Sequence, residues 1–298
     1  MKIGVTGSTG LVGSALVPLL ATHGHDVVGL RRYTESAKDQ EGWDPNTGRV
    51  TVSDTALDAL VHLAGENIAG GRWNAARKSR IRDSRVDGTR RLAETLAGQA
   101  QRPHTLVVAS AIGYYGDRGD ERLIESSNAG EGFLPEVCHA WEAATAPARD
   151  AGIRVVHLRI GIVLTPAGGA LAQMLLPFKM CVGGVIGPGR QYMSWIALDD
   201  VLAAIRHTLQ TETLDGPVNA VAPQPVTNAE FTSTLGRVLR RPTVMPLPAF
   251  FARLAFGEMA DALLLSSTRV QPARLEETGF TFQYPELEAA LRHVLERP

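Results

Sequence analysis

Residues 2–32 read KIGVTGSTGLVGSALVPLLATHGHDVVGLRR. A short apolar run predicts a strand that ends at Gly7, and further glycines follow at Gly10 and Gly13. Apolar residues then recur at steps of three and four, which predicts a helix, and a second strand is expected at 26–30. This order of strand, glycine turn and helix directs unpaired helix amides toward the turn, where a phosphate group fits.

Two arginines, Arg31 and Arg32, follow the second strand. In dinucleotide-binding units an acidic residue at this point holds a ribose 2′-hydroxyl, whereas an arginine accommodates a 2′-phosphate. A guanidinium also pairs with phosphate through two parallel hydrogen bonds. The pattern therefore favours NADP over NAD, and the alternative is that both arginines are solvated surface charges.

The composition sets the broad class of the protein. Its 298 residues carry a net charge of −1, which argues against a general nucleic-acid binder. Two cysteines give no disulfide framework, and His139, His157 and His207 show no metal-ligand spacing. No apolar run approaches the roughly 18 residues of a membrane span. We expect a cytoplasmic monomer or homodimer that takes a small-molecule substrate and has no nucleic-acid partner, membrane span or metal.

Apolar strand-like runs alternate with helical patterns farther along the chain, which predicts a parallel sheet covered by helices on both faces. The expected strands are 49–52, 59–63, 105–109 and 154–158, and the expected helices between them are 78–97 and 136–151. Ligands of such sheets lie beyond the carboxyl ends of the strands. Residues just after each strand, such as Gly65, Ser110 and Arg159, are therefore candidates for a binding site.

Several further segments carry a resemblance. They are LAG at 63–65, SAIGYYG at 110–116, RIGIVL at 159–164, WIALDDV at 195–201, WDP at 43–45, RW at 72–73, SRVDGT at 84–89 and GRQYMSW at 189–195. Together with the glycine spacing they resemble an extended or atypical short-chain dehydrogenase/reductase. Within that superfamily they resemble the "epimerase family" branch, which is similar to NAD-dependent epimerases and dehydratases and has a small C-terminal domain of unknown function.

The resemblance implies an α/β fold with a Rossmann-type, doubly wound parallel sheet and a small, mainly helical C-terminal domain on the substrate side. We expect the NADP-binding domain over residues 1–165, completed by parts of 196–222, and the smaller domain over 166–195 and 223–298. Helices are expected there at 170–179, 228–239, 249–265 and 286–295, with a short strand at 280–284.

The resemblance also implies roles for individual residues. Those implied to contact the pyrophosphate are Gly7, Thr9, Gly10, Leu11, Val12 and Gly13. Those implied to lie along the adenosine and ribose are Leu63, Ala64 and Gly65. Those implied to close over the nicotinamide end are Arg159, Gly161 and Ile162, with Ser110 near the nicotinamide. From the sequence alone, Gly161 is equally well explained as a turn glycine.

One departure from the family pattern concerns catalysis. Short-chain reductases normally carry Tyr-x-x-x-Lys, in which the lysine lowers the tyrosine pKa so that the phenol can exchange a proton with the substrate. If Glu142 is taken as the acidic residue one turn after the lysine, the two positions hold Leu134 and Cys138, and neither can do that task. No other Tyr-x-x-x-Lys occurs in the chain.

Tyr114 and Tyr115 are the available substitutes. Matching Tyr115 and Gly116 to the family's Tyr-Gly places Ala111 on the usual serine position, whereas matching Ser110 to the serine selects Tyr114. The candidate catalytic residues are thus Ser110, Tyr114 and Tyr115. The alternative is that one tyrosine packs against the strand while the other only walls the pocket.

Other residues have two interpretations. Arg72 or Lys78 could meet an anionic substrate, although most cations between 72 and 91 fit a solvated helix face. Met174, Phe178, Met193 and Trp195 line an apolar pocket or, more commonly at such spacing, form core. Asp199 and Asp200 are better explained by helix capping than as a catalytic pair. Thr227 with Glu230 is a helix-start signal.

Two classes of function remain. The first is an NADP-dependent oxidoreductase or epimerase-like enzyme that acts on an unknown small carbonyl or hydroxyl compound. Its proton would come from Tyr114, Tyr115 or water. The second is an NADP(H)-binding sensor or regulatory protein that has kept the nucleotide site and lost the chemistry. The absent Tyr-x-x-x-Lys favours the second, and the intact segment around Ser110 favours the first.

Overall fold

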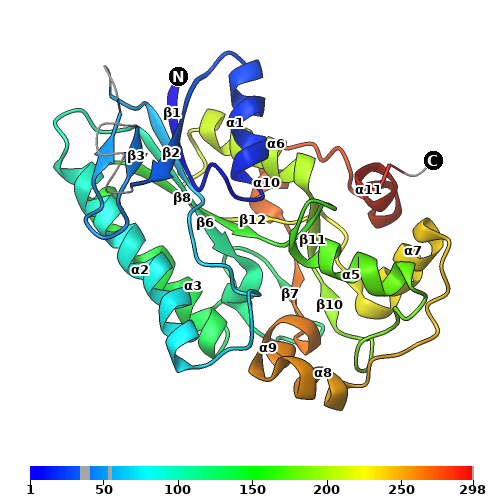
Figure 1. Ribbon diagram of the computed structural model, residues 1–298. Helices are drawn as coiled ribbons and strands as arrows, with labels where there is room; N and C mark the ends of the chain where they lie inside the picture. The colour runs from blue at the N-terminus through cyan, green and yellow to red at the C-terminus, as the bar shows by residue number, and fades with distance from the viewer. Residues whose placement is uncertain (34–40, 53–55, 297–298) are drawn as a thin grey trace.

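The computed structural model describes residues 1–33, 41–52 and 56–296 (Figure 1). At its centre lies an eight-stranded sheet in the order β12-β8-β6-β5-β1-β2-β3-β4, parallel throughout except between β3 and β4. The strands are β1 Lys2–Thr6, β2 Asp26–Arg32, β3 Gly42–Trp43, β4 Val50–Thr51, β5 Ala59–His62, β6 Thr105–Ala111, β8 Arg154–Ile160 and β12 Gly216–Ala220. The chain starts in mid-sheet and winds outward in both directions, which confirms the expected doubly wound, Rossmann-type fold.

Helices cover both faces of this sheet, because successive side chains of a strand point to opposite sides. Ile3 and Val5 pack with Leu16 on the face under α1, α6 and α10, while Val28 packs with Leu92 on the face under α2, α3 and α4. Figure 1 shows α1 and α6 on one side of the sheet and α2 and α3 on the other. The bounds are α1 Gly13–Thr22, α2 Ala75–Gly98, α3 Phe133–Ala143, α4 Ala146–Asp150, α6 Leu198–Gln210 and α10 Ala273–Glu277.

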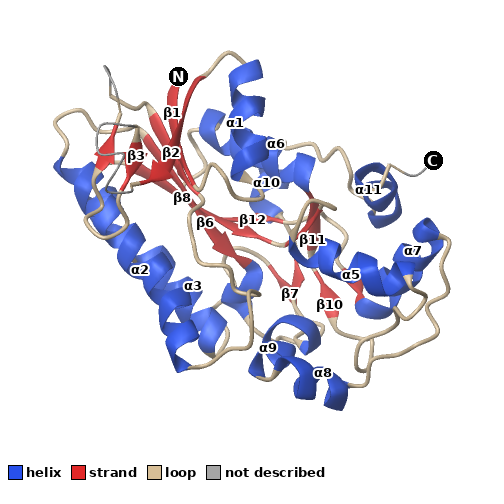
Figure 2. Ribbon diagram, viewed as in Figure 1, coloured by secondary structure: helices blue, strands red, loops and turns tan. Residues whose placement is uncertain are grey.

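A mainly helical C-terminal region lies beyond the carboxyl ends of the strands (Figure 2). Its helices are α5 Gly169–Lys179, α7 Asn228–Leu239, α8 Ala249–Phe256, α9 Glu258–Ala260, the π-helical turn η3 Asp261–Leu265 and α11 Leu287–Val294. Three small two-stranded sheets join it to the rest: β9 Ile162–Leu164 with β11 Trp195–Ala197, β10 Tyr192–Met193 with β13 Val226–Thr227, and β7 Arg122–Leu123 with β14 Arg269–Val270.

A separate apolar core holds this region together. Phe178, Met193 and Trp195 are buried in it with Phe231, and Met174 packs against its edge. The core interpretation of these residues is therefore confirmed. The capping box of α7 is also confirmed, because Thr227 and the Glu230 carboxylate exchange hydrogen bonds with each other's backbone amides.

Four of the expected elements or roles are wrong in detail. The helix expected at 136–151 is divided into α3 and α4. The helix expected at 249–265 is interrupted at Gly257, whose φ of +61° no helix accepts. The strand expected at 280–284 is a loop. Asp200 does not cap its helix. Its buried carboxylate accepts hydrogen bonds from the amides of Gln283 (2.7 Å) and Tyr284 (3.0 Å), and so holds that loop against α6.

Within the described ranges, no helix is long and apolar enough to cross a bilayer, and no group of three or more His, Cys, Asp or Glu side chains is placed to hold a metal ion.

Candidate functional site

The candidate site lies where the parallel strands of the large sheet end. Thr6 of β1 pairs with His62 of β5, and Ser110 of β6 pairs with Arg159 of β8, so the segments that follow these strands emerge along one edge. The C-terminal helical region faces the same edge (Figure 1). This is the edge at which doubly wound sheets bind their ligands.

The glycine loop between β1 and α1 is built on close backbone approaches. Gly7 has a φ of +69°, and a Cβ atom on it would lie within 3 Å of the backbone of Leu63 and Ala64. A Cβ atom on Gly13 would lie 2.2 Å from the carbonyl oxygen of Gly7. These approaches bring together two of the segments expected to bind the cofactor, the loop after β1 and the residues after β5.

The residues expected to contact pyrophosphate leave room for it. Thr9 and Gly10 are exposed, while Leu11 and Val12 are half-buried just before the first turn of α1. The first amides of a helix have no partner within the helix. A loop without side chains at Gly10 and Gly13, followed directly by a helix N-terminus, fits the phosphates of a dinucleotide.

Arg31 and Arg32 both lie at the exposed end of β2, but they point to opposite sides of the sheet. Gly29 lies against Ser8 of the glycine loop, and Arg31, two residues further on, shares that side of the strand. Arg32 shares the side of Leu30, which packs under α2. Neither arginine forms an ion pair with another described residue. The strand geometry thus directs Arg31 toward the glycine loop.

Ser110 and Arg159 do not follow their strands as expected but lie within them. Strands β6 and β8 each run two residues further than predicted, to Ala111 and Ile160. Both side chains are consequently buried, with 4% of Ser110 and 3% of Arg159 exposed. Gly161 and Ile162 come next, and their amides are hydrogen-bonded to carbonyl groups of neighbouring strand segments. A Cβ atom on Gly161 would lie 2.7 Å from the carbonyl of Ser194.

An ion pair organises the interior behind this edge. Arg159 donates from Nε and Nη2 to the two carboxylate oxygens of Glu142 on α3, both at 2.8 Å. Ser110 donates to the same carboxylate at 2.8 Å. Such a bidentate pair satisfies both charges without water, as burial requires. The hydroxyl of Ser110 and the guanidinium of Arg159 are thus occupied within the protein.

Tyr115 completes this network. Its hydroxyl accepts a hydrogen bond from Arg159 (2.9 Å) and donates one to Asn219 Oδ1 on β12 (2.7 Å). The side chain is fully buried, and burial raises its pKa to about 12 although Arg159 acts in the opposite direction. A phenol so held is a structural group that links β12 to β8.

Tyr114 is placed differently. Its ring lies over the guanidinium of Arg159, with 3.5 Å between Cζ and the ring centroid, and stacks loosely on His139. It is half-buried, and its hydroxyl makes no hydrogen bond to another described residue. Of the three candidate catalytic residues, the structure therefore leaves Tyr114 as the one with a free polar group.

The positions that resemble the tyrosine and lysine of other reductases are apolar in space as well as in sequence. Leu134 and Cys138 lie next to each other on α3 and face Gly113. Cys138 is buried, and burial raises the pKa of its thiol to about 12. No acid or base is available from either side chain.

Sequence reasoning missed three polar residues of the interior: Glu142 as a partner, Asn219 and Glu125. Glu125 is buried, accepts hydrogen bonds from the amides of Asn219 and Arg274, and has its pKa raised by burial. A glutamate between Ile124 and a run of polar residues gives no signal for burial. Their partners are 17 to 149 residues away in the chain, so only the fold reveals them.

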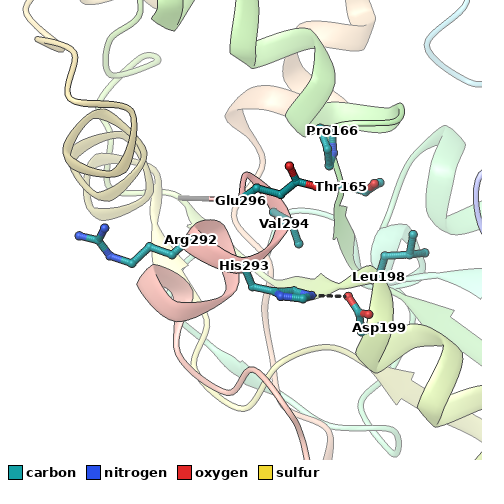
Figure 3. Close-up of a pocket in the computed structure, with 8 residues that line it drawn as sticks. All are labelled: Thr165, Pro166, Leu198, Asp199, Arg292, His293, Val294 and Glu296. Atoms are coloured by element: carbon teal, nitrogen blue, oxygen red, sulfur yellow. Dashed lines mark hydrogen bonds and ion pairs between the residues drawn. The ribbon is translucent and has the colours of Figure 1, made fainter. Parts of the chain in front are cut away.

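The described residues form at least two cavities. The larger, of about 510 Å³, lies between the end of β9, the start of α6 and the end of α11, with His293 hydrogen-bonded to Asp199 at 3.2 Å (Figure 3). None of the predicted cofactor or catalytic residues lines either of these two cavities. The smaller, of about 360 Å³, lies between the first turn of α3 and the α9–η3 segment, and Gly113 and Leu134 line it. Gly113 precedes Tyr114 in the chain and Leu134 matches the usual tyrosine position, so we consider the smaller cavity the candidate substrate cavity.

Lys78, a candidate for an anionic ligand, is already paired. Its ammonium lies 2.7 Å from the Glu258 carboxylate and 4.6 Å from the centre of the Phe133 ring. Arg72 lies against Gly257. Arg85 is turned inward, donates to the carbonyl oxygens of Glu66 and Ile81, and lies against Gly65.

Comparison with known proteins identifies the family of the chain. Residues 3–220 match the family model described as the NAD dependent epimerase/dehydratase family, and residues 247–294 match a domain of unknown function, DUF1731. An epimerase family protein of Mycobacterium tuberculosis (strain CDC 1551 / Oshkosh) is 43% identical over 297 residues, which cover 99% of this chain and 98% of that protein.

Two solved structures share the fold at substantial identity. The human epimerase family protein SDR39U1, crystallised with NADPH, is 35% identical with a TM-score of 0.90, and the match covers 99% of both chains. A protein described as the nucleoside-diphosphate sugar epimerase from Corynebacterium glutamicum is 40% identical with a TM-score of 0.79, and covers 99% of this chain and 58% of its own. The chain therefore belongs to the NAD-dependent epimerase/dehydratase family, in the epimerase family branch that carries a C-terminal DUF1731 region.

Proposed function

We propose that the protein is an NADP(H)-dependent oxidoreductase that acts on a carbonyl or hydroxyl group of a small molecule. The observation that carries this proposal is the position of Arg31, on the side of β2 that faces the glycine loop, where a 2′-phosphate requires a cation. A human relative 35% identical to this chain was crystallised with NADPH, which supports the same choice of cofactor.

Residues of the glycine loop and the strand ends would hold the dinucleotide. The backbone of Gly7, Thr9, Gly10, Leu11, Val12 and Gly13 would bind the pyrophosphate, with Leu63, Ala64 and Gly65 along the adenosine and ribose. The backbone of Arg159, Gly161 and Ile162 would lie at the nicotinamide end. Bound reduced nicotinamide supplies a hydride, which with one proton converts a carbonyl group to an alcohol.

The chain's own task is to position the group that supplies that proton. Ser110 and Tyr115 hold the Arg159–Glu142 pair in place, so the proton comes from Tyr114 or from water. The guanidinium under the Tyr114 ring stabilises negative charge that develops on the phenol when it gives up a proton. An epimerase or dehydratase cycle, in which the cofactor returns to its initial state, uses the same groups.

A second function, an NADP(H) sensor, is favoured by one specific observation. Leu134 and Cys138 occupy the positions of the usual catalytic pair, and the second is buried with a neutral thiol. A sensor needs the nucleotide site but no proton donor. It would bind NADPH and turn over no carbonyl compound.

The test is NADPH oxidation with a panel of aldehydes, ketones and quinones, together with a separate titration of NADPH and NADH binding. The oxidoreductase proposal expects turnover that falls by roughly tenfold or more in Tyr114→Phe, in the range that general acid catalysis contributes. Tyr115→Phe is the matched control for loss of a phenol, and its effect should be on stability. NADPH binding with no turnover across the panel favours the sensor, and equal affinity for NADH refutes the cofactor assignment.

A further inference from the structure

The cavity between α3 and the α9–η3 segment indicates what kind of substrate the protein takes. This inference rests on the proposed function, because it assigns a ligand to the same site. Gly113 and Leu134 place the cavity beside the position where other reductases carry their catalytic tyrosine. A volume of about 360 Å³ is at the small end of the range for ligand sites, roughly 300–1,000 Å³.

One wall of the cavity is apolar and aromatic. Trp73, Phe133, Leu134 and Pro135 form it, and the Trp73 and Phe133 rings meet edge to face with centroids 5.1 Å apart. The indole nitrogen of Trp73 donates to the carbonyl of Ile68 at 2.9 Å, which fixes the ring. A rigid aromatic wall of this kind favours a flat ring over a flexible polar chain.

The charges on the remaining walls are predominantly negative. Among the described lining residues four are carboxylates, and Arg253 is the single cation. Arg253 is already paired with Asp261 at 2.9 Å, and Glu258 is paired with Lys78. Asp117 and Glu131 form no ion pair with a described residue, but Asp117 Oδ1 accepts hydrogen bonds from the amides of Ser267 (3.1 Å) and Gly119 (3.3 Å). Among the described lining residues, Glu131 is therefore the carboxylate with neither an ion pair nor a side-chain hydrogen bond.

This balance disfavours an anionic ligand such as a nucleoside diphosphate sugar. A diphosphate is held by arginine, lysine or helix N-terminal amides. No lining cation among the described residues lacks an acidic partner. The first turn of α3 does reach the cavity, but Pro135 has no amide hydrogen there and the Glu131 carboxylate stands just before the helix. A cation gains from the same arrangement, both from the carboxylates and from the Trp73 ring, whereas the Phe133 ring already has Lys78 over it.

We propose that the substrate is a small, uncharged or cationic ring compound that bears the carbonyl or hydroxyl group, bound flat against the Trp73 ring with its edge toward Phe133. Glu131 sets its charge preference.

Binding of matched probes to the NADP⁺-loaded protein tests this, because no reduction occurs in that state. The probes are 4-trimethylammoniobenzaldehyde, its neutral isostere 4-tert-butylbenzaldehyde, 4-carboxybenzaldehyde and UDP-glucose, followed by ligand-observed NMR. We expect the cationic and neutral aldehydes to bind at least tenfold more tightly than the carboxylate and UDP-glucose. Glu131→Gln should lower the cation-to-carboxylate ratio by roughly three- to fivefold. Glu136→Gln, an exposed neighbour on α3 outside the cavity, should leave the ratio unchanged.

The outcomes separate the two proposals. Equal or tighter binding of UDP-glucose or the carboxylate overturns the substrate class, as does a charge preference that Glu131→Gln and Glu136→Gln alter equally. Failure of every aldehyde to bind also overturns it, and Trp73→Leu should weaken all three aldehydes together. Failure of NADP⁺ itself to bind refutes the proposed function. Selective binding of the cationic aldehyde without turnover by NADPH supports the substrate class and refutes only catalysis.

Discussion

Replacing Arg31 with alanine should weaken NADPH binding far more than replacing Arg32. The two residues are neighbours with the same charge and similar exposure, but alternation along β2 places them on opposite sides of the sheet. Only Arg31 shares the side of Gly29, which touches Ser8 of the glycine loop. Comparing the two alanine variants therefore separates the effect of side-chain direction from the effect of charge.

The magnitude follows from the chemistry at an exposed strand end. A hydrogen bond to a charged group contributes about 1.5–3 kcal/mol net, and the exposed position keeps the interaction in that modest range. Arg31→Ala should raise the Kd of NADPH by roughly 10- to 150-fold. Arg32→Ala should raise the Kd of NADPH by less than about threefold. Arg32 lies on the opposite side of the sheet from the glycine loop, and water and salt screen its charge there.

Calorimetric titration at low ionic strength measures both constants, with NADH as the reference ligand because it lacks the 2′-phosphate. The Kd of NADH should change little in either variant. The reasoning fails if Arg32→Ala weakens NADPH as much as Arg31→Ala does. It also fails if the affinity for NADH falls in parallel, since the arginine would then support the loop and not the phosphate.

Three further predictions concern the framework around the site. Glu142→Gln should lower the free energy of unfolding by about 3–5 kcal/mol, because it leaves Arg159 buried without a counter-charge; urea unfolding measures this. Gly13→Ala should abolish NADPH binding, because its Cβ atom would lie 2.2 Å from a backbone carbonyl. Stability should fall as the pH drops from 6.5 toward 4. Burial lowers the pKa of His62 and His157 to about 4 in the folded protein. Between pH 6.5 and 4 the unfolded chain therefore binds protons at these histidines that the folded chain does not bind.

Each of these has a control and a contrary result. For the ion pair the control is Glu121→Gln, which breaks an exposed pair with Arg118 and should cost at most about 1 kcal/mol; equal losses would contradict the argument. For Gly13→Ala in the glycine loop, the control variant is Gly98→Ala, where open space surrounds the new Cβ atom. For the pH effect, each histidine should lower the free energy of unfolding by at most about 3 kcal/mol. A free energy of unfolding that stays constant between pH 6.5 and 4 would refute the prediction.

The sequence predicted the parts of the fold that depend on local pattern. Glycines, a run of apolar residues and a terminal pair of arginines lie within 31 residues, so β1, α1 and β2 could be placed correctly. The helix-start signal at Thr227 is local in the same way. The break at Gly257 was missed because the apolar pattern continues through it. The positive φ of a glycine leaves no mark on a pattern of apolar residues.

The candidate site was predicted less completely, because its interior depends on register between distant strands. The expected ends of β6 and β8 fell two residues short, so Ser110 and Arg159 were expected at the ligand edge and are found inside the sheet. Pairing then places Arg159 between Ser110 and Asn219, which are 109 positions apart. Whether Tyr114 or Tyr115 faced inward was left open by the sequence, and the structure shows that Tyr115 does.

The Arg159–Glu142 pair has a consequence for where a proton donor can be placed. The two charges balance each other, and Ser110, Tyr115 and Asn219 complete their hydrogen bonds without help from residues 134 and 138. In this chain, the framework behind the nucleotide edge is therefore held together by residues other than those at the usual proton-donor positions.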